Sequence, residues 1–117
     1  MNKSVVKTKD VVGVCVKNAN DEDLGKIEEI ILDKVQGNVR YAVLSFGGFL
    51  GMGDKLFSIP WKALHYNKAK DSFVLNIDKE KLKNAPGFDK NNWPDWSDET
   101  WGTSIYDYYG TKPYWHG

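Results

Sequence analysis

The sequence has little of what disulfide-linked, membrane-spanning or nucleic-acid-binding proteins need. Its 117 residues include one cysteine, so no disulfide can form within the chain. No apolar run approaches the ~20 residues that span a bilayer, and the start MNKSVVKTKD has no apolar core of signal-peptide length. Sixteen basic side chains balance sixteen acidic ones, which argues against a nucleic-acid partner. We expect a cytoplasmic protein without direct membrane insertion, and a membrane-bound partner is compatible with this.

Motifs for catalysis or metal binding are also scarce. Neither His65 nor His116 has a second histidine or a cysteine at metal-ligand spacing, and no GxSxG motif occurs. The stretch Asn18-x-Asn20-x-Glu22 matches a calcium loop only in part, because its flanks are typical of strands and its glycine position is Asp23. We therefore expect no enzyme, no cofactor and no metal site, and we nominate no catalytic residue.

What the sequence does contain is a glycine-rich stretch, FGGFLGMGDKLFSIPW at residues 46–61. A phosphate-binding loop has the form GxxxxGK followed by Ser or Thr. Gly48 and Gly53 have this spacing, but Asp54 stands where the lysine is needed, and its carboxylate would repel phosphate. The residues after it are typical of a strand rather than a helix. The stretch therefore predicts a β-hairpin turn.

Three large apolar side chains lie within this turn, namely those of Phe49, Leu50 and Met52. Large apolar side chains at a hairpin tip are costly to expose. They either fold over the open end of a barrel or meet a partner.

Short apolar or alternating segments recur along the first three quarters of the chain. They predict strands at 11–16, 25–33, 39–46, 56–59 and 72–77, with turns of hairpin length between them. One or two helical turns are expected after Asp78, which is a suitable N-cap. Short strands joined by hairpin-length turns favour an all-β fold, a small antiparallel barrel or sandwich with a short helix. Because the core is small, a strongly bent sheet that closes into a β-barrel is the better way to cover its edges.

Residues 89–117 form an aromatic C-terminal extension that holds four of the five tryptophans. Disordered tails are poor in aromatic residues, so we expect this extension to pack on the barrel or on a partner. Ser97 followed by Asp98 and Glu99 is a start signal, and Gly110 a stop signal, for a helix over about 98–109. Such a helix places Trp101, Ile105 and Tyr108 on one face.

Several of these motifs together resemble the PRC-barrel domain. They are GKIEEIILD at 25–33, VRYAVL at 39–44, the glycine-rich turn, and Ser-Ile-Pro-Trp at 58–61. The resemblance covers about residues 9–88, and the tail resembles C-terminal extensions of some stand-alone members. The family includes the cytoplasmic domain of the photosynthetic reaction-centre H subunit and the C-terminal domain of a ribosome maturation factor. The resemblance implies a small bent β-barrel that serves in docking or assembly and carries no catalytic residue set. The sequence contains neither the H subunit's transmembrane helix nor the maturation factor's RNA-associated domain, so neither specific role is carried over.

The sequence thus predicts a polar arm at 1–8, a PRC-barrel-like domain at 9–88 and the aromatic extension at 89–117. The expected function is a non-enzymatic protein interaction or assembly module that self-associates as a homodimer. The alternative is a small-ligand or cofactor-binding domain that uses the aromatic tail and the barrel surface. The predicted interaction residues are Phe49, Leu50, Met52, Trp61, Trp93, Trp96, Trp101, Tyr108 and Tyr109.

Overall fold

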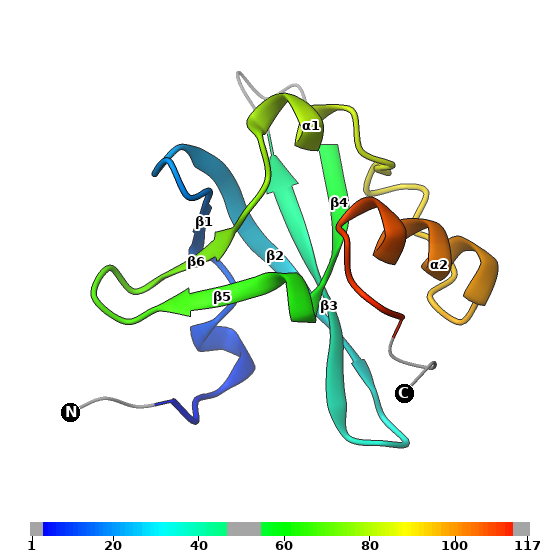
Figure 1. Cartoon of the computed structure of the whole chain (residues 1–117). Coiled ribbons are helices and arrows are strands. Elements are labelled where there is room, and N and C mark those ends of the chain that lie inside the picture. The colour runs from blue at the N-terminus through cyan, green and yellow to red at the C-terminus, as the bar shows by residue number, and fades with distance from the viewer. Residues whose placement is uncertain (1–3, 47–54, 114–117) are drawn as a thin grey trace.

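The structure is a computed structural model that describes residues 4–46 and 55–113. It is mostly β-sheet, as predicted, and its elements are shown in Figure 1. In chain order they are η1 (Thr8–Asp10), β1 (Cys15–Lys17), β2 (Asp23–Asp33), β3 (Asn38–Phe46), β4 (Lys55–Pro60), η2 (Trp61–Ala63), β5 (Leu64–Asn67), β6 (Ser72–Leu75), α1 (Lys79–Lys83) and α2 (Glu99–Tyr108).

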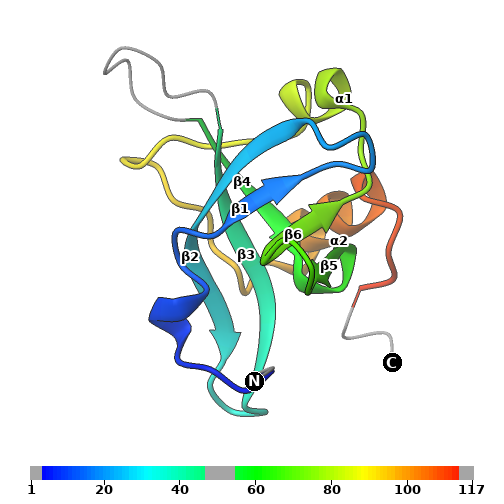
Figure 2. The ribbon, with the colours of Figure 1, turned by 90° about the vertical axis from the view of Figure 1, so that its left-hand side faces the viewer.

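The strands form one curled sheet in the order β4-β3-β2-β1-β6-β5. Figure 2 shows β1 between β2 and β6. The predicted sheet was antiparallel, and one pair departs from this. β1 and β6 run parallel, with Val16 opposite Phe73 and Lys17 opposite Val74, whereas the other pairs of described strands are antiparallel. The parallel pair arises because β6 of the β5–β6 hairpin pairs with β1, the first strand in the sequence, which is far from the hairpin along the chain.

The strand predictions are wrong in three places. The strand expected at 72–77 ends at Leu75, as β6. The strand expected at 11–16 begins only at Cys15, as β1, because Val11–Gly13 form a turn that continues from η1. Gly13 adopts a φ of +92°, and its N–H donates to the carbonyl of Ile27, which keeps the turn attached to β2. The strand β5 was not predicted, since its sequence LHYN contains no β-branched residue and only four positions.

Strand β3 is covered on both faces, which is why its middle is continuously buried. Ala42 and Leu44 point into the main core of the curled sheet, among apolar side chains of β2, β4, β6 and α1. Tyr41 points the other way and joins a second cluster with Ile105 and Tyr106 of α2. The alternation predicted for this strand is therefore present, but both of its faces are packed.

Helix α1 begins at its predicted cap, Asp78, and α2 begins within one residue of its predicted start. The side chain of Asp78 accepts a hydrogen bond from the N–H of Glu80 at the start of α1. The side chain of Asp98 accepts from the N–H groups of Thr100 and Trp101 at the start of α2. Such caps satisfy backbone donors that have no partner inside the helix.

The outer edge of β4 is covered by the chain that leads from α1 to α2. Leu56 and Phe88 exchange two backbone hydrogen bonds, of 2.9 and 2.8 Å. Gly87 lies so close to this edge that an added Cβ would be 2.9 Å from the carbonyl oxygen of Leu56. The start of the aromatic extension thus protects one edge of the sheet from pairing with another chain.

Candidate functional site

A pocket of about 390 Å³ lies where the N-terminal segment meets the β5–β6 hairpin. Its lining comes from two stretches that are distant in sequence, 4–14 and 61–73. The lining residues are Ser4, Val6, Asp10, Val11, Val14, Trp61, Tyr66, Asp71 and Phe73. We call this the N-terminal pocket. Its size is far above the ~30 Å³ that one water takes up in the liquid, so it has room for side chains or a small molecule.

The floor of the N-terminal pocket is a row of aromatic rings. Phe73 lies between the other two, with its ring centre 5.6 Å from that of Trp61 and 5.3 Å from that of Tyr66. Phe73 belongs to the main core, and Trp61, Val11 and Val14 pack against that core. The floor is therefore rigid and apolar, because the sheet beneath fixes its rings.

The rim of the pocket is acidic. The hydroxyl of Tyr66 donates a 2.6 Å hydrogen bond to Asp71, and this bond raises the pKa of the Tyr66 hydroxyl above its ordinary value of 10.0. Asp10 supplies a second carboxylate. Among the lining residues that the structure describes there is no lysine, arginine or histidine. Apolar groups that carry or adjoin a positive charge are the chemical match for such a site.

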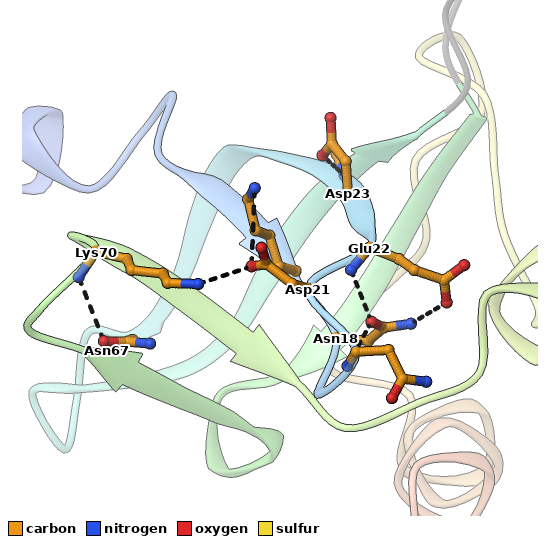
Figure 3. A network of polar contacts seen from close by, with 9 residues as sticks. Asn18, Asp21, Glu22, Asp23, Asn67 and Lys70 are labelled. Atoms are coloured by element: carbon orange, nitrogen blue, oxygen red, sulfur yellow. Dashed lines mark hydrogen bonds and ion pairs between the residues drawn. The ribbon is translucent and has the colours of Figure 1, made fainter.

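The β5–β6 hairpin, which supplies Tyr66 and Asp71, is held in place by the polar network of Figure 3. Asn67 accepts hydrogen bonds from the N–H groups of Ala69 and Lys70 and so closes the hairpin turn. The ammonium of Lys70 reaches across to Asp21, at 3.3 Å. This ion pair joins the hairpin to the turn between β1 and β2. As an exposed pair it contributes little free energy, but it restricts where the hairpin lies.

The turn on the other side of this ion pair contains the partial calcium motif. Asn18, which is buried, accepts hydrogen bonds from the N–H groups of Asn20 and Glu22 and donates to the carboxylate of Glu22. The oxygen that a calcium ion would need is thus used to form the turn. Within residues 4–46 and 55–113, no three His, Cys, Asp or Glu side chains are grouped so as to hold a metal ion.

Exposed apolar side chains lie in the N-terminal pocket and on residues next to its lining in the chain. Val5 is 91% exposed, Val6 47%, Val12 38% and Tyr66 46%. Val6 and Tyr66 line the pocket directly, and Val5 and Val12 adjoin lining residues in the chain. We call these four residues together with the pocket the N-terminal face. Such a concentration of apolar surface around a pocket is typical of a binding site.

Three of the predicted interaction residues lie instead within the chain's own packing. Trp96 donates its indole N–H to the hydroxyl of Ser58 in β4, at 3.2 Å. Trp101 packs on Tyr41 of β3, with ring centres 5.9 Å apart. Tyr108 contacts the main core and donates its hydroxyl to the carbonyl of Lys81 in α1. These side chains fasten the extension to the sheet.

Two further predicted residues differ in exposure. Trp93 is 42% exposed and stacks on Phe88 and Trp96 with ring-centre distances of 5.2 and 5.7 Å. Tyr109 packs against both apolar clusters, and burial, assisted by the neighbouring Tyr108, raises the pKa of its hydroxyl. Trp61 is the one predicted residue that lines the N-terminal pocket. Phe49, Leu50 and Met52 lie outside the described residues.

A second pocket, of about 330 Å³, lies between α1, the end of α2 and β5. Its lining includes the exposed side chains of Lys62, His65 and Lys81, and also Tyr109. The hydroxyl of Tyr109 is buried beneath this surface and has no hydrogen-bond partner within the described part of the chain. Because that hydroxyl is inaccessible, the pocket offers a ligand mainly mobile surface side chains.

Sequence reasoning missed most of the N-terminal face. The sequence predicts a polar arm at residues 1–8, although the apolar Val5 and Val6 interrupt it. The pair Tyr66 and Asp71 carries no sequence motif, and its place beside Asp10 depends on the parallel contact of β1 with β6. The adjacent apolar residues Val5 and Val6, in a stretch otherwise rich in lysine, were the one local indication of an exposed apolar surface.

Comparison with known proteins identifies the fold. Residues 4–82, about two thirds of the chain, match the PRC-barrel domain. The match includes the whole sheet and the N-terminal face, and it ends before α2. Among curated proteins, no similar protein is found. Of the helices in the described ranges, none has the length and apolar character that crossing a bilayer requires.

Proposed function

This chain belongs to the PRC-barrel domain family, and from that premise we propose that it is a non-enzymatic interaction module that self-associates through its N-terminal face. The observation that carries the proposal is the group of four exposed apolar side chains, Val5, Val6, Val12 and Tyr66, around one pocket.

The distribution of apolar surface favours this face over the aromatic extension. Figure 1 shows the N-terminal segment and α2 on opposite sides of the molecule. In α2, Ile105 and Tyr106 are each only 1% exposed, so the helix uses its apolar face on the chain's own sheet. A partner that docked on α2 would find mostly its polar side, whereas the N-terminal face presents its apolar side chains outward.

The pocket also favours a second candidate, a small-ligand binder. A row of three rings in a pocket of about 390 Å³ can hold a small apolar molecule. We rank it second because exposed apolar side chains extend beyond the pocket, to Val5 and Val12, where a small ligand would leave them uncovered. Self-association buries both the pocket and these valines.

Light scattering on the full chain over a range of concentrations tests the proposal. We expect a dimer, and we expect Val12→Asp to shift the mass toward the monomer because a carboxylate cannot be buried there without cost. Leu32→Asp is the matched control, since Leu32 is 53% exposed on β2 and lines a different pocket, together with Trp96 and Ser97. A wild-type chain that stays monomeric at high concentration would contradict self-association. Loss of the dimer in the control alone would place the interface elsewhere.

Point variants suit this test better than truncation of the extension. A chain that ended at Phe88 would lack Ile105 and Tyr106, which complete the second apolar cluster with Tyr41. Its change in mass or melting temperature would mix loss of packing with loss of an interface.

A further inference from the structure

The chain's own N-terminal segment borders the N-terminal pocket without filling it. Ser4 and Val6 lie in its wall, but Val5 is 91% exposed and Val6 47%. Residues 4–7 form neither helix nor strand. The segment then enters η1, whose last residue, Asp10, is itself part of the pocket wall. The segment therefore contributes to the wall of the pocket and does not occupy its interior.

The chemistry of this segment complements that of the pocket. The sequence Val5-Val6-Lys7-Thr8-Lys9 combines two apolar side chains with two cations. The pocket combines an apolar, aromatic floor with the carboxylates of Asp10 and Asp71. Valines on the floor and lysines at the acidic rim bury apolar surface and pair opposite charges at the same time.

We propose that residues Val5–Lys9 of a second copy occupy the N-terminal pocket, and that the two copies exchange these segments reciprocally. The inference rests on the proposed function and specifies how the face works. The arrangement is isologous: each copy gives one segment and receives one, so both pockets are filled and the assembly closes as a dimer. It covers Val5 and Val6, which the single chain leaves exposed.

The first test compares two valines of equal exposure. Val5→Asp places a carboxylate against the acidic rim in both halves of the dimer, and we expect dimer dissociation to become easier by about 100-fold or more. Val35→Asp is the matched control, because Val35 is 89% exposed in the turn between β2 and β3. We expect it to leave the dimer unchanged. Thermal melts of both variants check that the monomer fold is intact.

The second test uses a synthetic peptide of residues 1–9, MNKSVVKTK, titrated into the full-length Val5→Asp chain by calorimetry. This variant keeps its own pocket available, and we expect the peptide to bind at least about tenfold more tightly than a peptide with both valines replaced by serine. Binding should weaken in Asp71→Asn, which removes a rim charge and retains a hydrogen-bond acceptor. Equal binding of the two peptides overturns the proposal.

The outcomes distinguish failure of segment exchange from failure of the proposed self-association. If Val12→Asp is monomeric and Val5→Asp remains a dimer, the face mediates association and segment exchange is wrong. If both variants remain dimers, the N-terminal face itself is the wrong surface. If the wild-type chain is a monomer at every concentration, both self-association and exchange fail.

Discussion

At the scale of single residues, Gly25 shows how closely β2 and β3 approach. It adopts a φ of +125°, and an added Cβ would lie 2.0 Å from the carbonyl oxygen of Ser45. No side chain fits at that distance, so β2 and β3 could not keep their register with a larger residue here. The first irregularity of the β2–β3 pair, between Ile27 and Glu29, follows two residues later. The bend of the sheet at this point depends on a residue without a side chain.

We predict that Gly25→Ala lowers the free energy of unfolding by about 3 kcal/mol, because strain at a positive φ adds to the clash with Ser45. Gly37→Ala is the control, since Gly37 also has a positive φ, +74°, but nothing lies within 4 Å of its added Cβ. We expect a loss of about 1 kcal/mol there. Urea unfolding of both variants measures the difference. Equal losses would show that close approach does not matter at Gly25.

Asp33 is the second residue with a measurable signature. The N–H of Gln36, at 3.0 Å, and that of Val35, at 2.9 Å, donate to its carboxylate, and Arg40 lies 3.7 Å away. These hydrogen bonds, that of Gln36 first, lower the pKa of the Asp33 carboxyl below its ordinary value of 3.8 and outweigh the opposing effect of burial. The carboxylate therefore closes the turn between β2 and β3 best when it is ionised.

Because the folded pKa lies below the unfolded value, the stabilisation from Asp33 is complete above about pH 4 and is lost as the pH falls through the folded pKa. We predict that Asp33→Asn is less stable than wild type at about pH 6 and that this difference shrinks at about pH 3. Unfolding curves at the two pH values measure it. A difference that is constant with pH would exclude ionisation of Asp33 as its cause.

At the scale of elements, helix α2 packs on the outer face of β3 and forms a second, smaller apolar cluster there. The hydroxyl of Tyr106 reaches the backbone carbonyl of Arg40, at 3.3 Å. Ile105 and Tyr106 form a cluster with Tyr41. The extension is thus bound to the barrel by packing on one side of β3 and by the Phe88 bridge at the edge of β4.

We predict that Ile105→Ala lowers the free energy of unfolding by about 2–5 kcal/mol, as expected for a cavity at a residue that is 1% exposed. Ser104→Ala, one residue earlier on the exposed side of α2, should change it by less than about 0.5 kcal/mol. Denaturant unfolding at two protein concentrations is the measurement. A loss that depends on concentration would indicate that α2 packs between copies instead of on its own sheet.

The helices and strands also show which parts of the fold the sequence alone predicts. The strand at 39–46 follows from local alternation, and the strand at 25–33 from its β-branched residues and its short length between two turns. The cap of α1 follows from Asp78, so these elements were predictable. Strand β5 and the parallel contact of β1 with β6 depend on partners far away in sequence, which no local pattern specifies. The same contact assembles Asp10, Trp61 and Tyr66 into one pocket, so the site was less predictable than the fold.

At the scale of the whole molecule, the apolar surface is divided between two sides. The aromatic extension packs on the chain's own sheet, whereas the N-terminal face leaves apolar side chains exposed. Formal net charge is zero, so no overall repulsion opposes contact between two copies. In the dimer that we propose, the lysines of the N-terminal segment and the acidic rim of the pocket are the local charges that orient the two copies.

The measurement that tests this account most directly is hydrogen–deuterium exchange of the full chain at low and high protein concentration. We predict that raising the concentration slows amide exchange in residues 5–14 and 64–73, which form the N-terminal face, and leaves residues 99–108 of α2 unchanged. Exchange that is independent of concentration throughout, or slowing confined to α2, would contradict self-association through the N-terminal face.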